Sequence, residues 1–237
     1  RSYEGKRPPR KKLPDSFYHQ TDSLEHWNLG KLVVKATAVF INGGTFRNDL
    51  STARGPYPYF DGLHIHFKNI DAGLTNLLLK GDTLATQLTL STTERSGFEV
   101  KQLDAAFRWF PGGMELNQLL LETPKSRLTD FFALRFRDFN HDMTNFISHV
   151  RMEGRFNNSR IHTDDIAFFA PELKGWNDLL TVTGTVNGTV EHLKGKALEI
   201  TTGRTTRFKG DFVMDGLPDI NNTFIDVDAQ DFTTTYN

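Results

Sequence analysis

The sequence lacks cysteine, long apolar runs and an excess of either charge. Because there are 0 Cys among the 237 residues, structural disulfides, thiolate chemistry and cysteine-based metal sites are excluded. No apolar run approaches the ~18–20 residues that cross a bilayer as a helix. A formal net charge of -1 provides no bulk attraction for nucleic acid. We therefore expect no nucleic-acid partner.

Sequence motifs of catalysis are also missing. No glycine-rich phosphate loop follows an expected strand, and no Gly-x-Ser-x-Gly nucleophile elbow occurs. Two carboxylate pairs, Asp164 with Asp165 and Asp226 with Asp228, have the residue type that glycoside hydrolysis uses. They fall in turns or on the polar side of expected strands, where solvated carboxylates are the commoner case. We expect no enzyme, no catalytic residue and no cofactor.

Histidine gives only a weak indication of a metal site. His64 and His66 share the polar face of one expected strand, and a His-x-His pair can ligate zinc. A zinc site needs three or four ligands, and no partner for this pair is evident. His162, close to Asp164 and Asp165, is an equally weak candidate. Solvated strand histidines are the simpler interpretation, so we predict no metal.

The sequence is rich in phenylalanine and in alternation of apolar with polar residues. Its 20 Phe stand against 5 Tyr and 3 Trp, and Phe fills apolar space without needing a hydrogen-bond partner. Alternation is the pattern of a strand with one wet face and one apolar face. About a dozen segments of ~6–12 residues alternate in this way between short turns, and long helices are missing. The pattern predicts an all-β fold of repeated antiparallel hairpins with little helix.

The clearest hairpin lies between Gly97 and Thr123. Pro111-Gly112-Gly113 separates two alternating runs and predicts a tight turn. A break in the alternation at Gln102-Leu103 predicts a β-bulge. The apolar faces expected for the two strands are Leu103, Ala105, Phe107 and Trp109 in the first, and Met114, Leu116 and Leu120 in the second.

Other segments carry turn signals or leave two interpretations open. Asn42-Gly43-Gly44 and Asn157-Asn158 both have turn composition, and the second is expected to separate strands over 145–156 and 160–169. Residues 71–80 fit either a helix or a strand; we favour the strand because Gly81-Asp82 then makes a hairpin turn. Pro171 suits the first position of a short helical turn.

The chain divides into two parts. Residues 1–30 are a basic, proline-containing entry segment, and residues 31–237 are a single β segment. The run Lys6–Lys12 is interpreted as a solvated arm, with contact to anionic lipid headgroups as the alternative. Because the chain opens with Arg1 rather than Met, we expect it to be a piece of a longer protein.

The order of several motifs resembles the AsmA-like TamB family, the inner-membrane component of a translocation and assembly module. The resemblance covers about residues 30–237, and it depends on order and spacing more than on any single residue. The motifs are Gly81-Asp82-Thr83-Leu84, Glu94-Arg95-Ser96-Gly97-Phe98, Leu119 to Ser126, Asp165 to Leu173, Gly184 to Thr189, and Gly216-Leu217-Pro218-Asp219.

This resemblance implies an elongated, curled antiparallel sheet, a β-taco with an open groove. It also implies a periplasmic segment, anchored to the inner membrane in the full-length parent, of a Gram-negative envelope-assembly protein. The apolar groove would carry phospholipid or fatty acyl chains between the inner and outer membranes, support outer-membrane protein insertion, or both. An Omp85-type outer-membrane barrel would be a partner through parts that this sequence does not contain. The alternative is a carbohydrate-binding or structural β-sandwich or β-solenoid module of a cell-envelope protein.

The expected lipid-binding groove is made of the apolar side chains that alternation places on one face. Each of them also fits an ordinary sheet-on-sheet core. The predicted groove residues are Phe98, Val100, Leu103, Phe107, Trp109, Leu116, Leu120, Leu134, Phe136, Val150, Met152, Phe156, Val182, Val186, Phe208 and Phe212.

Overall fold

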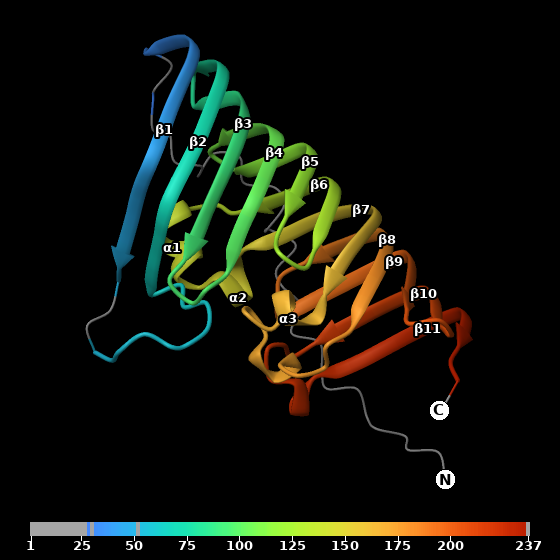
Figure 1. The fold of residues 1–237 in the computed structure, drawn as a ribbon. Helices are drawn as coiled ribbons and strands as arrows, with labels where there is room; N and C mark the ends of the chain where they lie inside the picture. Colours follow the sequence, from blue (N-terminus) through green and yellow to red (C-terminus); the bar gives the residue numbers. More distant parts are fainter. Residues whose placement is uncertain (1–27, 29–30, 51–52, 236–237) are drawn as a thin grey trace.

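The computed structural model describes residue 28 and residues 31–50 and 53–235, so most of the expected entry segment lies outside the described residues. Eleven strands form one antiparallel sheet in which each strand pairs with its neighbours in sequence (Figure 1). The strands are β1 (Val33–Asp49), β2 (His64–Lys80), β3 (Thr83–Glu94), β4 (Glu99–Phe110), β5 (Gly113–Glu122), β6 (Arg127–Arg135), β7 (Arg151–His162), β8 (Leu179–Gly188), β9 (His192–Thr202), β10 (Thr206–Asp215) and β11 (Phe224–Thr233).

Among the described residues, helix is confined to short pieces at the ends of the strands. These are α1 (Phe139–Thr144), α2 (Phe146–His149), α3 (Thr163–Ile166), and the 3₁₀ turns η3 (Pro171–Leu173) and η4 (Ile220–Asn222). No helix among the described residues is long and apolar enough to cross a membrane.

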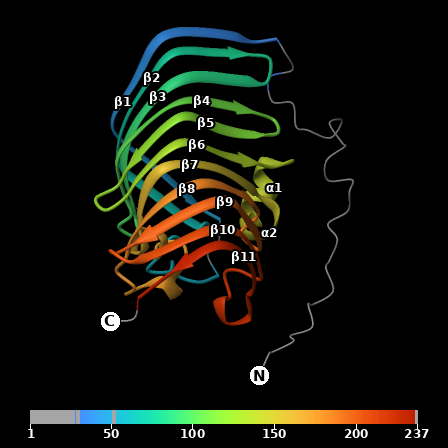
Figure 2. The same ribbon diagram turned by 90° about the vertical axis from the view of Figure 1, so that its right-hand side faces the viewer.

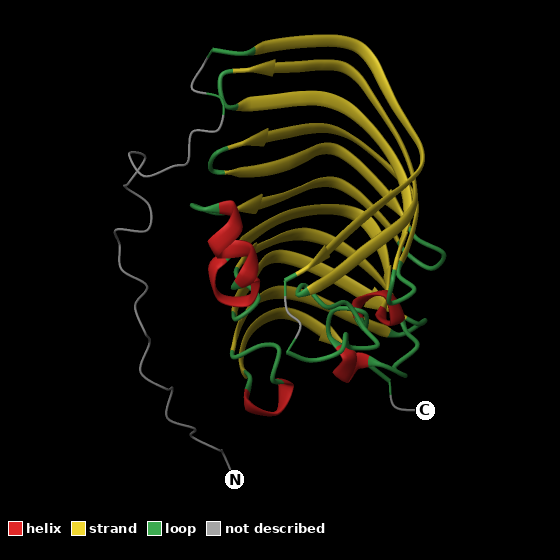
Figure 3. Ribbon diagram, turned by 90° about the vertical axis from the view of Figure 1, so that its left-hand side faces the viewer, coloured by secondary structure: helices red, strands yellow, loops and turns green. Residues whose placement is uncertain are grey.

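The sheet is curled along its length into a trough. In Figures 2 and 3 the strands arc, so that the sheet encloses one of its faces and turns the other outward. The sheet is open, with β1 at one edge and β11 at the other. The expected all-β, curled antiparallel architecture is therefore confirmed. The alternative of a β-sandwich is wrong for the described residues, because their strands form one sheet rather than two packed sheets.

β-bulges explain how the long strands bend. Opposite Ala105 the register of β4 and β5 shifts by one residue, and Gln118 on β5 has a left-handed φ of 53°. Similar shifts occur next to Asn158 (φ 49°) on β7 and Ala197 (φ 48°) on β9. An extra residue on one strand kinks it and increases its twist. Because neighbouring strands carry their bulges near the middle, the bends combine into the curl of the trough.

Side chains of adjacent strands satisfy the backbone groups that the bulges free. The Asp211 carboxylate on β10 accepts a hydrogen bond of 2.8 Å from the N–H of Ala197 on β9. Thr183 Oγ1 on β8 accepts one of 3.0 Å from the N–H of Asn158 on β7. Asp71 on β2 does the same for Gly43 on β1, at 2.8 Å. These three bulges are thus capped from the next strand, which compensates for the lost ladder bond.

Two expected turns are wrong because they are bulges. Asn42-Gly43-Gly44 lies inside the continuous strand β1, and Asn157-Asn158 lies inside β7. Asn and Gly tolerate positive φ, which both a hairpin turn and a bulge require, so composition alone does not separate the two. The expected strand over 145–156 is also partly wrong, because Phe146–His149 is helical.

Several local expectations are confirmed. Strand β4 ends at Phe110 and β5 begins at Gly113, so the predicted tight turn is present. The register shift between β3 and β4 places an extra residue on β4 between Val100 and Leu103, where the bulge was expected. Residues 71–80 lie in strand β2, and Pro171–Leu173 forms the short helical turn.

Replacing Ala197 by Gly tests the cost of the bulge. We expect Ala197→Gly to stabilise the protein by roughly 0.5–1 kcal/mol, because glycine adopts a left-handed φ without the penalty that an L side chain incurs. The matched control is Ala106→Gly in the regular part of β4, where glycine should destabilise by roughly 1 kcal/mol. Urea unfolding of both variants checks the sign, and a destabilised Ala197→Gly would contradict the interpretation.

Candidate functional site

The register of the sheet assigns each strand side chain to a face. Directly opposed residues of an antiparallel ladder point to the same side, and successive residues of a strand point to opposite sides. Leu84 pairs with Trp109, Trp109 with Met114, and Met114 with Leu134. Leu134 in turn pairs with Met152. A row of five large apolar side chains therefore crosses β3 to β7 on one face.

Further rows of the same face continue to the far edge of the sheet. Phe107 pairs with Leu116, and Leu116 pairs with Phe132. Toward β11, Phe208 pairs with Ile200 and Phe232. We call this side of the sheet the apolar face. It is largely apolar from β3 to β11, although Thr86, opposite Phe107, and Ser159, opposite Val182, also lie on it.

The apolar face is the concave one. Side chains converge on the inner side of a curved sheet and spread apart on its outer side. In the middle of the trough Ala105, Leu119 and Leu198 are only 5%, 4% and 1% exposed, although no second sheet covers them among the described residues. Crowding by their neighbours on the enclosed side accounts for this burial.

Most of the predicted groove residues lie on the apolar face. They come from six different strands, which the curl brings into one trough. These residues are Val100, Leu103, Phe107, Trp109, Leu116, Leu134, Met152, Phe156, Val182, Val186, Phe208 and Phe212.

Leu120 is a wrong prediction. It pairs with Asp104, whereas Leu121 pairs with Leu103 of the apolar face. The bulge at Gln118 reverses the alternation of β5, so Leu119 and Leu121 point into the trough and Leu120 points outward. Sequence reasoning missed Leu119 and Leu121 for this reason. The glutamine in an otherwise leucine-rich strand is the only local signal of the break.

Three other predicted residues lie at the rims rather than on the floor. Phe136 and Val150, which are 5% and 0% exposed, bracket the α1–α2 segment that follows β6. Phe98 lies in the turn between β3 and β4 and contacts Phe168 and Phe169 edge-on, with ring centroids 5.4 and 5.3 Å apart. These side chains are already covered by protein, so they serve packing.

At each rim of the trough, where the strands end, a short helical segment packs against the sheet through aromatic contacts. We call these two segments, α1–α2 and α3–η3, the covers. At one rim the ring of Phe139 in α1 lies 5.4 Å from Trp109 and 5.4 Å from Phe136. At the other rim Phe169 lies 5.2 Å from Phe60. Figure 3 shows α1 and α2 at one rim and α3 at the other. The covers therefore border the trough, and within the part of the chain that the structure describes no second layer lies over the middle of the sheet.

The apolar face is most accessible along the two edge strands. On β1, Val39 and Ile41 are 41% and 43% exposed. On β11, Ile225, Val227 and Phe232 are 48%, 51% and 63% exposed. Large apolar side chains lining both edges of an otherwise charged surface usually mark a place where something binds.

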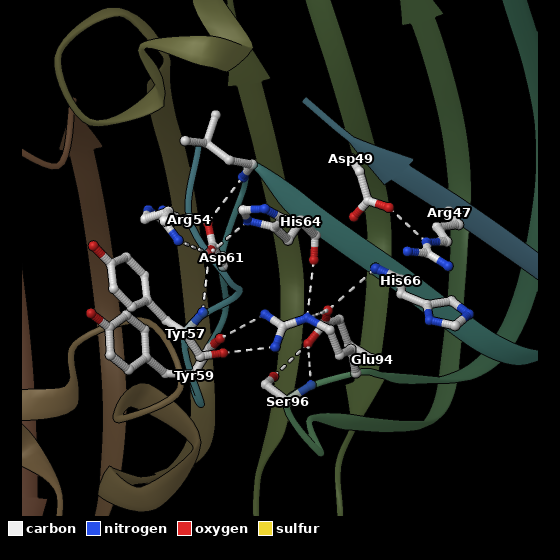
Figure 4. Close-up of polar contacts among 12 residues, drawn as sticks. Arg47, Asp49, Arg54, Tyr57, Tyr59, Asp61, His64, His66, Glu94 and Ser96 are labelled. Atoms are coloured by element: carbon white, nitrogen blue, oxygen red, sulfur yellow. Dashed lines mark hydrogen bonds and ion pairs between the residues drawn. The ribbon is translucent and has the colours of Figure 1, made fainter. Parts of the chain in front are cut away.

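A buried carboxylate organises the loop before β2. Asp61, 5% exposed, accepts hydrogen bonds from the Arg54 guanidinium at 2.7 and 3.2 Å and from the backbone N–H groups of Tyr57 and Leu63 at 3.2 and 3.1 Å (Figure 4). His64 Nδ1 lies 3.1 Å from it. The Arg54 hydrogen bond is the main cause that holds the pKa of the Asp61 carboxyl well below its ordinary value.

A second charged pair joins this loop to β3. The Arg95 guanidinium donates to the carbonyls of His64, Tyr57 and Tyr59 at 3.0, 2.7 and 3.2 Å. Glu94, whose side chain is fully buried, accepts from the backbone N–H of Ser96 at 2.6 Å. The Arg95 guanidinium and the Glu94 carboxylate form hydrogen bonds with backbone groups of this loop and turn. Their role is therefore to hold the rim together rather than to bind a ligand.

Asp164 and Asp165 are also structural, whereas Asp226 and Asp228 are exposed on β11. Asp165 accepts hydrogen bonds from the hydroxyls of Thr123 and Ser126, and Asp164 pairs with Lys125, which together fasten α3 to the β5–β6 turn. His64 is 6% exposed, so the prediction of a solvated strand histidine is wrong there. His66 donates its backbone N–H to Glu94.

Substitution of Asp61 tests how much the buried Arg54–Asp61 pair contributes to the stability of the fold. At pH 7, Asp61→Asn should cost on the order of 2–4 kcal/mol, because it leaves Arg54 without its buried partner. A depressed pKa stabilises the fold above the unfolded value of ~3.9, and this contribution is lost as pH falls below it. The difference between wild type and variant should therefore shrink at pH 3, as measured by urea unfolding.

Asp49→Asn is the matched control for this substitution. Asp49 pairs with Arg47, whose side chain is 66% exposed, and such surface pairs contribute at most about 1 kcal/mol. If Asp61→Asn lowers the free energy of unfolding no more than Asp49→Asn does at pH 7, the buried Asp61 carboxylate is not what stabilises the loop before β2.

Comparison with known proteins adds no relative. No family model matches the chain, and no curated protein or solved structure is similar to it. The likeness to the TamB family therefore remains a resemblance of motifs, and the function is argued from the trough itself.

Proposed function

We propose that this chain is a lipid-binding β-trough of a TamB- or AsmA-like envelope-assembly protein. Its apolar face would hold acyl chains of phospholipid passing between the inner and outer membranes, support insertion of outer-membrane proteins, or do both. The observation that carries the proposal is the largely apolar face from β3 to β11 on the concave side of a single open sheet.

The energy of hydrocarbon burial sets what such a trough must do. Each CH₂ group moved out of water contributes about 0.8 kcal/mol, so a ~16-carbon chain is worth roughly 13 kcal/mol. A lipid that leaves a bilayer loses about that much. The trough must therefore replace most of this contact along an extended path, which a face that crosses many strands supplies better than a single pocket does.

Small residues keep the floor of the trough even. Glycines alternate with large side chains on the apolar face, and an added Cβ at Gly154 would lie 2.8 Å from the ring of Phe156. An added Cβ at Gly195 would lie 2.6 Å from the ring of Phe212. The rings of Phe156 and Phe212 thus pack directly against the backbone of these glycines. A floor of low relief suits a ligand that slides rather than one that is held in a specific pocket.

The outer face of the sheet supports the same assignment because it carries charged side chains that water can solvate. Arg108, Glu115, Arg135 and Glu153 form a charge ladder across β4 to β7, with N–O distances of 3.7, 2.7 and 2.9 Å. Partial burial lowers the pKa of Arg135, but the hydrogen bonds to the carboxylates of Glu153 and Glu115 together outweigh it, so that the pKa is raised. One face binds water and charge, and the opposite face offers hydrocarbon.

The proposal includes the surroundings that the resemblance implies. The segment would lie in the periplasm of a Gram-negative cell, with its parent anchored in the inner membrane and working with an Omp85-type barrel. It would have no enzymatic role and need no cofactor, since the trough acts by offering apolar surface. These assignments are supported by the motif order and by the curled sheet together.

A carbohydrate-binding module is the less favoured alternative. Such a module needs aromatic rings free to stack on sugars in a polar cleft. Trp176 is 63% exposed but stands alone among the described aromatic rings, and Tyr57 and Tyr59, the neighbouring pair of rings, stack on each other at 5.1 Å. The guanidinium of Arg54 lies 3.8 Å from the ring centroid of Tyr57. The ring of Tyr57 is therefore already engaged by protein groups.

The direct test is to purify the chain, extract it with organic solvent and analyse the extract for phospholipid. We expect copurifying phospholipid and saturable uptake of a fluorescent fatty acid. A lipid-free protein that also takes up no fatty acid would remove the basis for the proposal.

Paired substitutions on the two faces localise the binding. Phe107→Gln combined with Phe212→Gln changes the apolar face and should lower fatty-acid affinity at least about tenfold, which corresponds to about 1.4 kcal/mol of lost contact. Leu120→Gln combined with Val213→Gln changes the outer face of strands β5 and β10 and should leave the affinity unchanged. Fluorescence titration measures both.

The folded state of both double variants is checked by circular dichroism and urea unfolding. Equal loss of fatty-acid affinity in the two variants would contradict a binding site on the concave face. Global unfolding of the apolar-face variant alone would identify that face as a sealed core.

A further inference from the structure

Two short helices at one rim bring together three side chains that no sequence motif associates. His141 and Asp142 lie in α1, and His149 ends α2. His141 Nδ1 lies 3.2 Å from Asp142 Oδ1, and His149 Nδ1 lies 3.3 Å from the same oxygen. All three donor atoms lie within 4.8 Å of one another. None of these residues contributes to the apolar face.

The spacing of the donor atoms matches tetrahedral coordination. Zinc binds imidazole nitrogen and carboxylate oxygen at about 2.0–2.1 Å, which places neighbouring ligands of a tetrahedron about 3.3 Å apart. The two measured separations of 3.2 and 3.3 Å correspond to two edges of such a tetrahedron. The two imidazole nitrogens approach the carboxylate oxygen from different helices, at distances that a hydrogen bond to Asp142 also accounts for in the absence of an ion.

The carboxylate is held in place before any ion binds. Asp142 is 6% exposed, and its Oδ2 accepts hydrogen bonds from the backbone N–H groups of Arg137 at 2.7 Å and Asp138 at 3.3 Å. Oδ1 is thereby directed at the two histidines. The side chains of His141 and His149 are 63% and 40% exposed, so an ion can reach the site from solvent. Their rings stack with centroids 5.2 Å apart.

We propose that His141, Asp142 and His149 form a binding site for a zinc-like divalent transition metal. Two imidazoles and one carboxylate suit zinc, copper or nickel, whereas calcium and magnesium prefer oxygen ligands alone. Three protein ligands leave a fourth position for water. In the metal-bound form each histidine carries its proton on Nε2, so that the Nδ1 lone pair points to the ion.

Metal binding would have a structural consequence at the rim. Helices of six and four residues are far too short to be stable alone. The ion would cross-link α1 to the end of α2. Since Phe139 at the start of α1 contacts Trp109, the same cross-link would fix one cover of the trough. The metal site itself does not depend on the proposed lipid function.

Isothermal titration calorimetry with zinc chloride tests the site. We expect one zinc ion per chain, a loss of affinity of at least about tenfold in His141→Ala and in His149→Ala, and no comparable binding of magnesium. His66→Ala, which removes a histidine from β2, is the matched control and should bind like wild type. Replacement of zinc by cobalt should give the visible absorption of a four-coordinate ion in wild type and lose it in His141→Ala.

Retention of the fold in each variant is verified by circular dichroism. His141 is largely exposed, so His141→Ala keeps the test decisive even where His149→Ala is unstable. The proposal is overturned by three results: no zinc binding in wild type, undiminished binding in His141→Ala, or an equal loss in His66→Ala.

Discussion

The structure depends on the unequal faces of one antiparallel sheet. A flat sheet with one apolar face exposes that face to water unless a second layer covers it. Here no second sheet exists among the described residues, and curvature takes its place. Bending the strands toward the apolar side crowds side chains such as Leu119 and Leu198 against their neighbours until almost no surface remains. The fold thus shields hydrocarbon in the middle of the trough by its shape, while the edge strands remain exposed.

The curvature is supplied by the same residues that made the sequence hard to interpret. Alternation indicated strands, faces and the turn after Phe110, because the pattern of period two is local. It did not separate a bulge from a turn at Asn157-Asn158, since both can hold a residue in the left-handed region, which asparagine tolerates. One extra residue also reverses every later side chain of its strand, which is why Leu120 was expected on the wrong face. The bulge at Gln102-Leu103 was predicted because it breaks the alternation of apolar residues, whereas the bulges at Gln118 and Asn158 were not, since no comparable break was recognised there.

The candidate metal ligands and the polar contacts of Asp61 could not be predicted from the sequence for a different reason. The residues between Asp142 and His149 have in part the pattern of a strand, but the structure forms two short helices there. The packing of Phe136 and Trp109 on Phe139 stabilises these helices and so brings the three ligands together. Asp61 likewise gains its partners only when the loop before β2 folds back. Such contacts arise from tertiary packing, which overrides local propensity.

An open trough also explains the distribution of charge and polar networks. The buried pairs Arg54–Asp61 and Arg95–Glu94 lie where the strands end, and none of them lies on the floor. A buried charge on the floor would have to be desolvated by any guest hydrocarbon, at a cost of several kcal/mol. At the rims the same charges are satisfied by backbone carbonyls and N–H groups, and they hold the covers in place without touching the apolar path. Separating the polar networks from the floor is therefore what keeps a single curved sheet both folded and able to accept an apolar guest.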